Sequence, residues 1–275
     1  MAQIYFNNDD CINVMQSLKN NGTKVNIILT SPPYNSGRNS NSERSRKERE
    51  SRYDVHLDNM TDIEYCNWIV KLFNNFDDIL QKDGVIIWNI SYGCEKPNSM
   101  WLSLFHILEK TNFMISDSIV WKKSSCLPNN TSHHSLSRIC EFIFILCRKS
   151  EYETYQANKK ITSVSSTGQK YYENIFNFIT APNNDGSCDL NKATYSSELC
   201  VKLLKIYAKK NDVVYDPFMG TGTTAIGCEI YGNKDMICIG SEISLEQVKF
   251  SKKRLENYRR LNPSGFVNDS EVSLF

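Results

Sequence analysis

The segment Thr30-Ser31-Pro32-Pro33-Tyr34 is the first part of the chain whose residue types are suited to chemistry. It directly follows a short apolar run, which predicts a strand. Two consecutive prolines remove two backbone donors and fix two φ angles, so the strand ends here in a stiff turn. The turn presents the Ser31 hydroxyl, backbone carbonyls and the Tyr34 ring. A rigid turn with these groups is suited to hold a flat, polar, aromatic ligand.

A second segment, Asp216–Thr224, joins a strand pattern to a helix pattern. Gly220 and Gly222 allow the backbone to approach a ligand closely, and the helix beginning near Thr223 offers unpaired N–H groups. The segment has no lysine, as a P-loop would, and lacks the third glycine of the dinucleotide fingerprint. About twenty residues further on, Glu242 follows the next strand, where an acid can accept hydrogen bonds from ribose hydroxyls. We therefore predict a nucleoside cofactor without a diphosphate cradle.

Alternating apolar patterns of period 2 and period 3.6 predict an α/β fold that positions these two segments. Strands are expected at 4–6, 25–30, 85–90, 115–121, 140–147, 213–215 and 236–239, and helices at 11–18, 62–80, 100–109, 197–208, 225–231 and 244–261. In a doubly wound sheet both chemical segments lie at one edge, near a topological switch point. The turn that begins with Ser31 and the turn that contains Gly220 should therefore face each other.

Two stretches interrupt this alternation. Residues 36–54 contain no aliphatic side chain, and their basic residues are Arg38, Arg44, Arg46, Lys47, Arg49 and Arg52. We expect a mobile basic loop there, either simply solvated or ordered against phosphates when nucleic acid binds, and its place beside the proline turn favours the second. Residues 148–193 are rich in Tyr, Asn, Lys, Ser and Thr with weak periodicity, which predicts an inserted module. Lys122 and Lys123, which leave the sheet just before, are further candidates for contact with nucleic acid.

The composition excludes several classes of protein. The 275 residues are 40% apolar and 23% charged, with a formal net charge of +1, so a nucleic-acid footprint must be local. None of the ten cysteines forms a Cys-x-x-Cys pair, so we expect reduced thiols and neither disulfides nor a metal site. No apolar run approaches the roughly 20 residues of a membrane span, and the first residues do not resemble a signal peptide. These features predict a cytoplasmic protein.

Ser31-Pro32-Pro33-Tyr34 and Asp216-Pro-Phe-x-Gly-x-Gly-Thr resemble the catalytic and cofactor motifs of S-adenosylmethionine-dependent DNA amino-methyltransferases. The catalytic motif precedes the cofactor motif, an order that resembles the β subgroup, and the resemblance extends from about residue 4 to 260. It implies a Rossmann-like, doubly wound mixed sheet of seven strands. It also implies one catalytic domain, 1–275, with a target-recognition insertion within 123–193. S-adenosylmethionine would be the cofactor and double-stranded DNA the partner.

The resemblance also assigns roles to residues. The catalytic residues would be Ser31, Pro32, Pro33 and Tyr34, and the cofactor-binding residues Asp10, Cys11, Thr30, Ser197, Asp216, Phe218, Gly220, Gly222, Thr223 and Glu242. Asp10 resembles a family turn that meets the adenine ring, although Asn8 and Asp9 replace its glycine. Ser197 lies in a segment that resembles the binding site for the methionine end of the cofactor.

The mechanism follows from the groups on the proline turn. An exocyclic amine is a poor nucleophile because its lone pair is delocalised into the ring. The Ser31 hydroxyl and the Pro32 carbonyl can accept its two hydrogens and direct the lone pair at the sulfonium methyl, so that transfer is a direct displacement. The base must be flipped out of the duplex, and Tyr34 can stack on it. Methylation at cytosine C5 needs a thiolate, and the Pro-Cys dipeptide of enzymes with that chemistry is absent.

Ser31 also favours one target atom. Serine before Pro-Pro-Tyr resembles cytosine-N4 enzymes, whereas an acid there is usual for adenine N6, and a hydroxyl can also donate to cytosine N3. Adenine N6, a nucleic-acid-binding protein with a vestigial cofactor site, and an enzyme acting on RNA or a protein amide are the alternatives. A homodimer and a separately acting restriction endonuclease are further expected partners, with nucleoid association through DNA.

Overall fold

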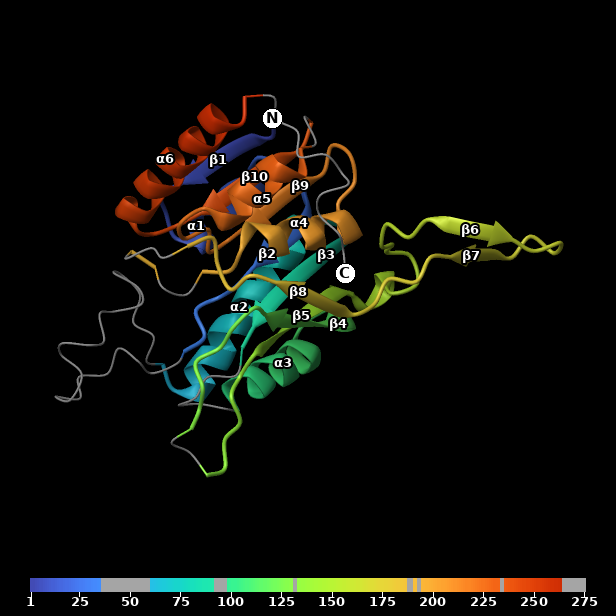
Figure 1. Cartoon of the computed structure of the whole chain (residues 1–275), viewed down its shortest axis with the longest axis horizontal. Coiled ribbons are helices and arrows are strands. Elements are labelled where there is room, and N and C mark those ends of the chain that lie inside the picture. The colour runs from blue at the N-terminus through green and yellow to red at the C-terminus, as the bar shows by residue number, and fades with distance from the viewer. Residues whose placement is uncertain are drawn as a thin grey trace.

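The computed structural model describes residues 1–35, 60–91, 98–130, 133–186, 190–191, 194–232 and 235–263. The basic segment 36–54 lies outside the described residues, so its predicted DNA contacts stay a prediction. Figure 1 shows a twisted central sheet with helices on both faces and one hairpin that projects far from the body.

The central sheet is mixed and has the strand order β1-β10-β9-β2-β3-β5-β4-β8. Its strands are β1 (Gln3–Asn7), β2 (Val25–Thr30), β3 (Leu80–Ile90), β4 (Phe113–Lys123), β5 (Cys140–Arg148), β8 (Phe178–Ala181), β9 (Val213–Asp216) and β10 (Ile237–Ser241). In this sheet β5 runs antiparallel to both of its neighbours, and the other pairs are parallel. The predicted doubly wound α/β class is thus confirmed, with eight strands instead of seven. The additional strand, β8, has only four residues with alternating burial, too short a pattern to detect in the sequence.

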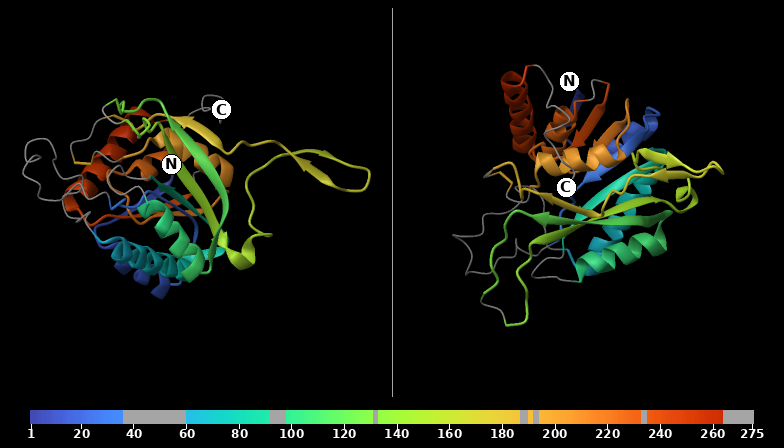
Figure 2. Two further views of the ribbon diagram at one scale, coloured as in Figure 1. Left: turned by 90° about the horizontal axis from the view of Figure 1, so that it is seen from below. Right: turned by 45° about the vertical axis from the view of Figure 1, so that its right-hand side comes forward.

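Helices cover both faces of the sheet, as Figure 2 shows. The helices α1 (Cys11–Asn20), α2 (Asp62–Ile79) and α3 (Ser99–Lys110) bury their apolar stripes in one core. The helices α4 (Ser197–Tyr207) and α5 (Thr223–Tyr231) form a second core on the opposite face, and α6 (Leu245–Leu261) packs beside α5 and β1. Local sequence explains where several of these helices begin. Asp10 accepts a hydrogen bond from the Ile12 amide, and Thr61 and Glu64 form a capping box at the start of α2.

The residues between β4 and α4 divide into parts that lie at opposite edges of the sheet. The register of β4 against β5 and β8 puts Lys123, Cys140 and Ala181 at the same edge as Thr30. The hairpin of β6 (Ile161–Val164) and β7 (Lys170–Tyr172) follows β5 and the short helix η2 (Lys149–Glu151), so it leaves the opposite edge (Figure 1). Residues 123–193, within which the target-recognition insertion is predicted, thus include strands of the central sheet and segments at both of its edges, and the position of the insertion within them stays a prediction.

Three further observations concern the described residues. None of their helices is long and apolar enough to cross a membrane. Their eight cysteines are all free thiols. No three His, Cys, Asp or Glu side chains in this part of the chain lie close enough together to hold a metal ion.

Candidate active site

The two chemical segments meet where β2 and β9 lie side by side. The Thr30 hydroxyl at the end of β2 donates to Asp216 Oδ1 at the end of β9, over 2.7 Å. From this pair of strands the chain proceeds in opposite directions across the sheet, toward β3 on one side and β10 on the other. This is the topological switch point at which doubly wound sheets bind ligands. The prediction that both turns share one edge is therefore confirmed.

Asp216 connects the proline turn and the glycine turn through its buried carboxylate. Its carboxylate accepts hydrogen bonds from the Phe218 amide at 3.0 Å, from the Tyr195 hydroxyl at 3.4 Å and from the Thr224 hydroxyl, besides that from Thr30. Complete burial raises the pKa of this carboxyl above its ordinary value, while these donors oppose the rise. Asp216 therefore fixes the conformation of the glycine turn.

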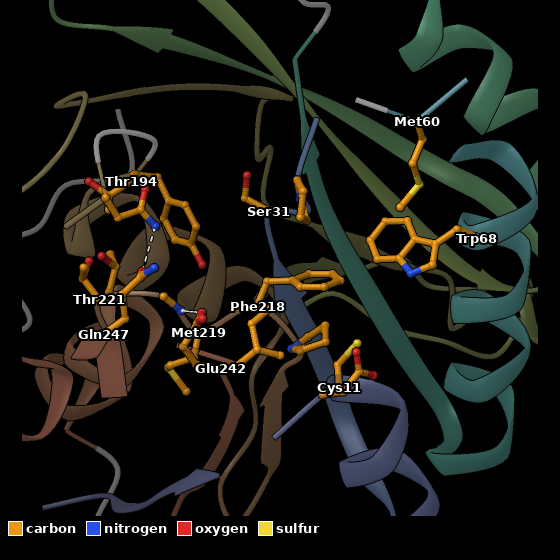
Figure 3. Close-up of a pocket in the computed structure, with 18 residues that line it drawn as sticks. Cys11, Ser31, Met60, Trp68, Thr194, Phe218, Met219, Thr221, Glu242 and Gln247 are labelled. Carbon is orange, nitrogen blue, oxygen red and sulfur yellow. Dashed lines mark hydrogen bonds between the residues drawn. The ribbon is translucent and has the colours of Figure 1, made fainter. Parts of the chain in front are cut away.

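A cavity of about 320 Å³ opens above the glycine turn and is drawn in Figure 3. It is lined by Asp10, Cys11, Ser31, Pro33, Met60, Trp68, Asn191, Thr194, Tyr195, Pro217, Phe218, Met219, Gly220, Thr221, Thr223, Glu242, Ile243 and Gln247. Figure 3 shows Trp68 and Met60 on one side, the polar Thr194 and Gln247 on the other, and Ser31 and Phe218 between them. An elongated ligand with one apolar, flat end and one polar end fits this division.

Glu242 is held rigidly in the wall of this cavity. Its Oε2 accepts the Gly220 amide at 3.0 Å, and its Oε1 accepts the Ser244 amide at 2.9 Å. Each carboxylate oxygen can accept a further hydrogen bond, so the side chain is preorganised for the two hydroxyls of a ribose. The role predicted from sequence fits this position.

The flat end of the cavity is formed by Phe218 and by residues that sequence reasoning missed. The Trp68 ring lies 5.6 Å from the Phe218 ring, centroid to centroid, at an angle of 46°. Trp68 lies within α2 and Met60 just precedes that helix, so neither residue belongs to the two chemical segments. The polar residues Asn191 and Gln247 were also missed, because neither belongs to a recognisable motif. These contacts arise between segments far apart in the sequence.

The predicted cofactor residues divide into two groups. Some of them line the cavity: Asp10, Cys11, Phe218, Gly220, Thr223 and Glu242. The others are part of the described structure but do not line it: Thr30, Ser197, Asp216 and Gly222. Thr30, Asp216 and Gly222 support the turn from behind. Ser197 lies at the start of α4, where its amide and hydroxyl bind the Asp185 carboxylate. The cavity wall nearest to it is formed by Thr194 and Tyr195 instead.

Cys11 lines the cavity but is not suited to nucleophilic chemistry. Burial, together with the nearby Asp10, raises the pKa of its thiol to about 12. A thiol with this pKa stays protonated at neutral pH, and the thiolate is the nucleophile. The geometry therefore agrees with a direct displacement that needs no covalent intermediate on the enzyme.

A smaller cavity of about 180 Å³ lies beside the first. It is lined by Ser31, Tyr34, Asn89, Trp121, Lys123, Glu141, Asn183, Asn184, Thr194 and Tyr195. Ser31, Thr194 and Tyr195 line both cavities. A ligand in each cavity would therefore meet the other at Ser31.

The proline turn is anchored so that Ser31 stays at this junction. The Pro33 carbonyl accepts the Tyr65 hydroxyl of α2 at 2.8 Å. The hydroxyls of Ser31 and Tyr34 lie 2.7 Å apart, so Tyr34 engages its polar end as well as offering its ring. The predicted stacking of this ring on a base stays a prediction.

The two lysines proposed to contact DNA have different surroundings. Lys122 is exposed. Lys123 reaches into the smaller cavity, where it forms an ion pair with Glu141 and its ammonium lies 5.2 Å from the Trp121 ring centroid. Lys123 can thus meet a group bound in this cavity, and its predicted contact with DNA stays a prediction.

A family model described as DNA methylase, N6_N4_Mtase, matches residues 25–253, which is most of the chain. The chain belongs to this DNA methylase family. The family recognised from the two motifs is confirmed, and with it S-adenosylmethionine as the cofactor that the larger cavity fits.

The named proteins to which this DNA methylase is similar are distant in sequence. The type II methyltransferase M.BglII of Bacillus subtilis is 24% identical over 260 residues, which cover 88% of this chain and 66% of that protein. M.Cfr9I of Citrobacter freundii, also named a type II methyltransferase, is 24% identical over 284 residues, which cover 90% of this chain and 86% of that protein. The chain thus spans about two thirds of the first relative and most of the second.

Solved structures confirm the fold. The cytosine-N4-specific PvuII DNA methyltransferase superposes with a TM-score of 0.63 and 16% identity, covering 98% of this chain and 95% of that chain. M1.HpyAVI superposes with a TM-score of 0.57 and 23% identity, covering 93% and 98%.

The DNA methylase should lose cofactor affinity when Gly222 is replaced by alanine. Gly222 has φ +81°, and an added Cβ would lie 2.9 Å from Ser251 Cβ. The clash must displace the glycine turn, so we expect the dissociation constant for S-adenosylmethionine to rise about tenfold or more. Gly168→Ala is the matched control, because Gly168 has φ +85° with open space around it. Isothermal titration of both variants checks this; equal affinities would contradict the role of Gly222.

Proposed function

We propose that this chain is a site-specific DNA methyltransferase that moves the methyl group of S-adenosylmethionine to N4 of a cytosine flipped out of the duplex. The observation that carries the proposal is the position of Ser31 in the walls of both cavities. The larger cavity suits the cofactor, with its ribose on Glu242. The smaller one suits the base, whose amine would then face the sulfonium methyl beside Ser31.

The groups around the smaller cavity support cytosine over adenine. Next to its amine and ring N3, cytosine carries the acceptor O2, whereas adenine carries a C–H at the equivalent place. Lys123 and Asn89 supply N–H donors to this cavity, and both can donate to O2. Adenine offers no acceptor at this place, so these donors would gain no hydrogen bond from it, which disfavours adenine. Ser31 in place of an acid supports the same choice.

Target recognition is proposed for the loops at the catalytic edge. Residues 124–130 and 133–139 follow β4, and residues 182–186 follow β8, both at the edge that carries Ser31. Leu127 and Leu136 are almost fully exposed there, as large apolar side chains are when they await a partner. The hairpin of β6 and β7 leaves the opposite edge, so we assign it no part in reading the target of its own active site.

The names of the relatives support a restriction-modification context, in which a separate endonuclease cuts the same unmodified sequence. Such an enzyme would act in the cytoplasm at the nucleoid. A homodimer stays a prediction that sedimentation velocity of the free protein and of its DNA complex can test.

The product identifies the reaction. We expect N4-methylcytosine in nucleosides prepared from unmodified DNA that was treated with the enzyme and S-adenosylmethionine, and mass spectrometry measures it. N6-methyladenine alone would contradict the choice of cytosine. Failure to bind S-adenosylmethionine in a titration would favour a nucleic-acid-binding protein with a vestigial cofactor site.

A further inference from the structure

A hydrogen-bond network of polar side chains extends along the smaller cavity from the catalytic turn to β4. Ser31 Oγ lies 2.7 Å from the Tyr34 hydroxyl, which lies 3.3 Å from Glu141 Oε2. The other oxygen of Glu141 pairs with the ammonium group of Lys123. The Asn89 amide donates to Glu141 Oε2 at 3.2 Å and to the Tyr34 hydroxyl at 3.4 Å. No sequence motif indicates this hydrogen-bond network, because its members come from four separate segments.

The carboxylate fixes the direction of these hydrogen bonds. An ionised carboxylate only accepts, so the single proton of the Tyr34 hydroxyl points to Glu141. The hydroxyl oxygen of Tyr34 must then accept the single proton of Ser31, so in this arrangement Ser31 does not supply the predicted hydrogen bond to cytosine N3. This orientation turns a lone pair of Ser31 Oγ away from Tyr34, toward the space in which an amine would bind. Glu141 thereby decides that Ser31 acts as an acceptor.

We propose that Glu141 is a positioning residue for methyl transfer, and that it receives through Tyr34 and Ser31 the proton that the amine must lose. The inference rests on the proposed function. As the N–CH3 bond forms, the S–CH3 bond breaks with its electron pair passing to sulfur, and the nitrogen becomes positive. The amine proton passes to Ser31 Oγ, the Ser31 proton to Tyr34, and the Tyr34 proton to the Glu141 carboxylate. S-adenosylhomocysteine and a neutral methylated amine result, and Glu141 then releases the proton to solvent.

A purely structural role for Glu141 explains less of the geometry. The strands β4 and β5 are already joined by backbone pairing, with Trp121 opposite Glu141, so the ion pair with Lys123 is not needed to hold them together. The side-chain oxygen of the neighbouring Asn89 is buried without a hydrogen-bond partner. An unpaired buried acceptor costs about 1–3 kcal/mol, and such groups are retained at sites that a ligand completes.

The experiment compares Glu141→Gln with a matched control. Glu151 also has a largely buried carboxylate in an ion pair, with a side-chain exposure of 13% against 11% for Glu141, but it follows β5 at the far edge. Single-turnover methylation of unmodified DNA with labelled S-adenosylmethionine gives the rate. We expect Glu141→Gln to slow transfer about 100-fold while the dissociation constant for S-adenosylmethionine and the KM for DNA change less than about twofold. Glu151→Gln should leave the rate unchanged.

Tyr34→Phe removes the hydroxyl in the middle of the same hydrogen-bond network and keeps the aromatic ring. Because the members act as a unit, the double variant should be no slower than the slower single variant, within about twofold. A Glu141→Gln rate within twofold of the wild type, or effects that multiply in the double variant, would overturn the inference. If Glu141→Gln does not fold, Tyr34→Phe decides alone, and a wild-type rate for it overturns the relay. An adenine product from the wild type would instead overturn the proposed target base.

Discussion

Replacing Ser31 by alanine should slow methyl transfer at least about 100-fold, the typical effect of removing one preorganised hydrogen-bonding group or general base at a reacting centre. The amine would lose the acceptor that directs its lone pair, and the polar chain through Tyr34 would lose its first member. Ser31 only borders the larger cavity, so affinity for S-adenosylmethionine should change less than about twofold. Rapid-quench measurement of the first turnover, beside a cofactor titration, tests both statements.

Ser103→Ala is the matched control for this experiment. Ser103 is a buried serine whose hydroxyl donates to the Met100 carbonyl within α3, away from both cavities, whereas Ser31 is partly exposed. We expect it to methylate at the wild-type rate. A Ser31→Ala rate within twofold of the wild-type rate would contradict both the role of Ser31 as an acceptor and the proposal that base and cofactor meet at this residue.

Replacing Asp216 should have the largest effect on stability. In Asp216→Ala the hydroxyls of Thr30, Tyr195 and Thr224 and the Phe218 amide all lose their common acceptor in a buried place. We expect the free energy of unfolding to fall by about 3 kcal/mol or more, with a melting temperature lower by roughly 5–10 °C. Cofactor binding should be lost with it, because the glycine turn is no longer held.

Asp216→Asn separates the loss of acceptors from the loss of charge. The asparagine oxygen can still accept the Phe218 amide, while the hydroxyls of Tyr195 and Thr224 can rotate to accept from its NH2 group. Burial already raises the pKa of the Asp216 carboxyl, so removing the charge costs little at neutral pH. We expect a loss of only about 1 kcal/mol, measured by urea unfolding. Equal destabilisation by both substitutions would show that the charge, and not the set of acceptors, holds the two turns together.

Local sequence was sufficient for the elements and for the two chemical turns. The apolar periods located the strands of the central sheet except β8 and the helices that cover it, and side chains within three positions form the cap at Asp10 and the capping box at Thr61. Gly222 adopts the left-handed conformation at the start of α5 that only glycine adopts readily. These features depend on residues within a few positions of one another, so their physical causes are present in the sequence itself. The resemblance of the two motifs then identified the family and its cofactor.

Only the tertiary structure decided which side chains surround the turns. The pairing of β4 with β5 brings Lys123 to Glu141, and the neighbouring β3 adds Asn89, although none of the three belongs to a motif. Trp68 became part of the cofactor cavity because α2 packs across the end of β2, where Tyr65 holds the proline turn. The order of the strands likewise places the hairpin of β6 and β7 at the edge of the sheet opposite to Ser31, despite the aromatic and basic composition of the hairpin. Contacts between residues tens to hundreds of positions apart depend on strand order and register, and no local pattern encodes either.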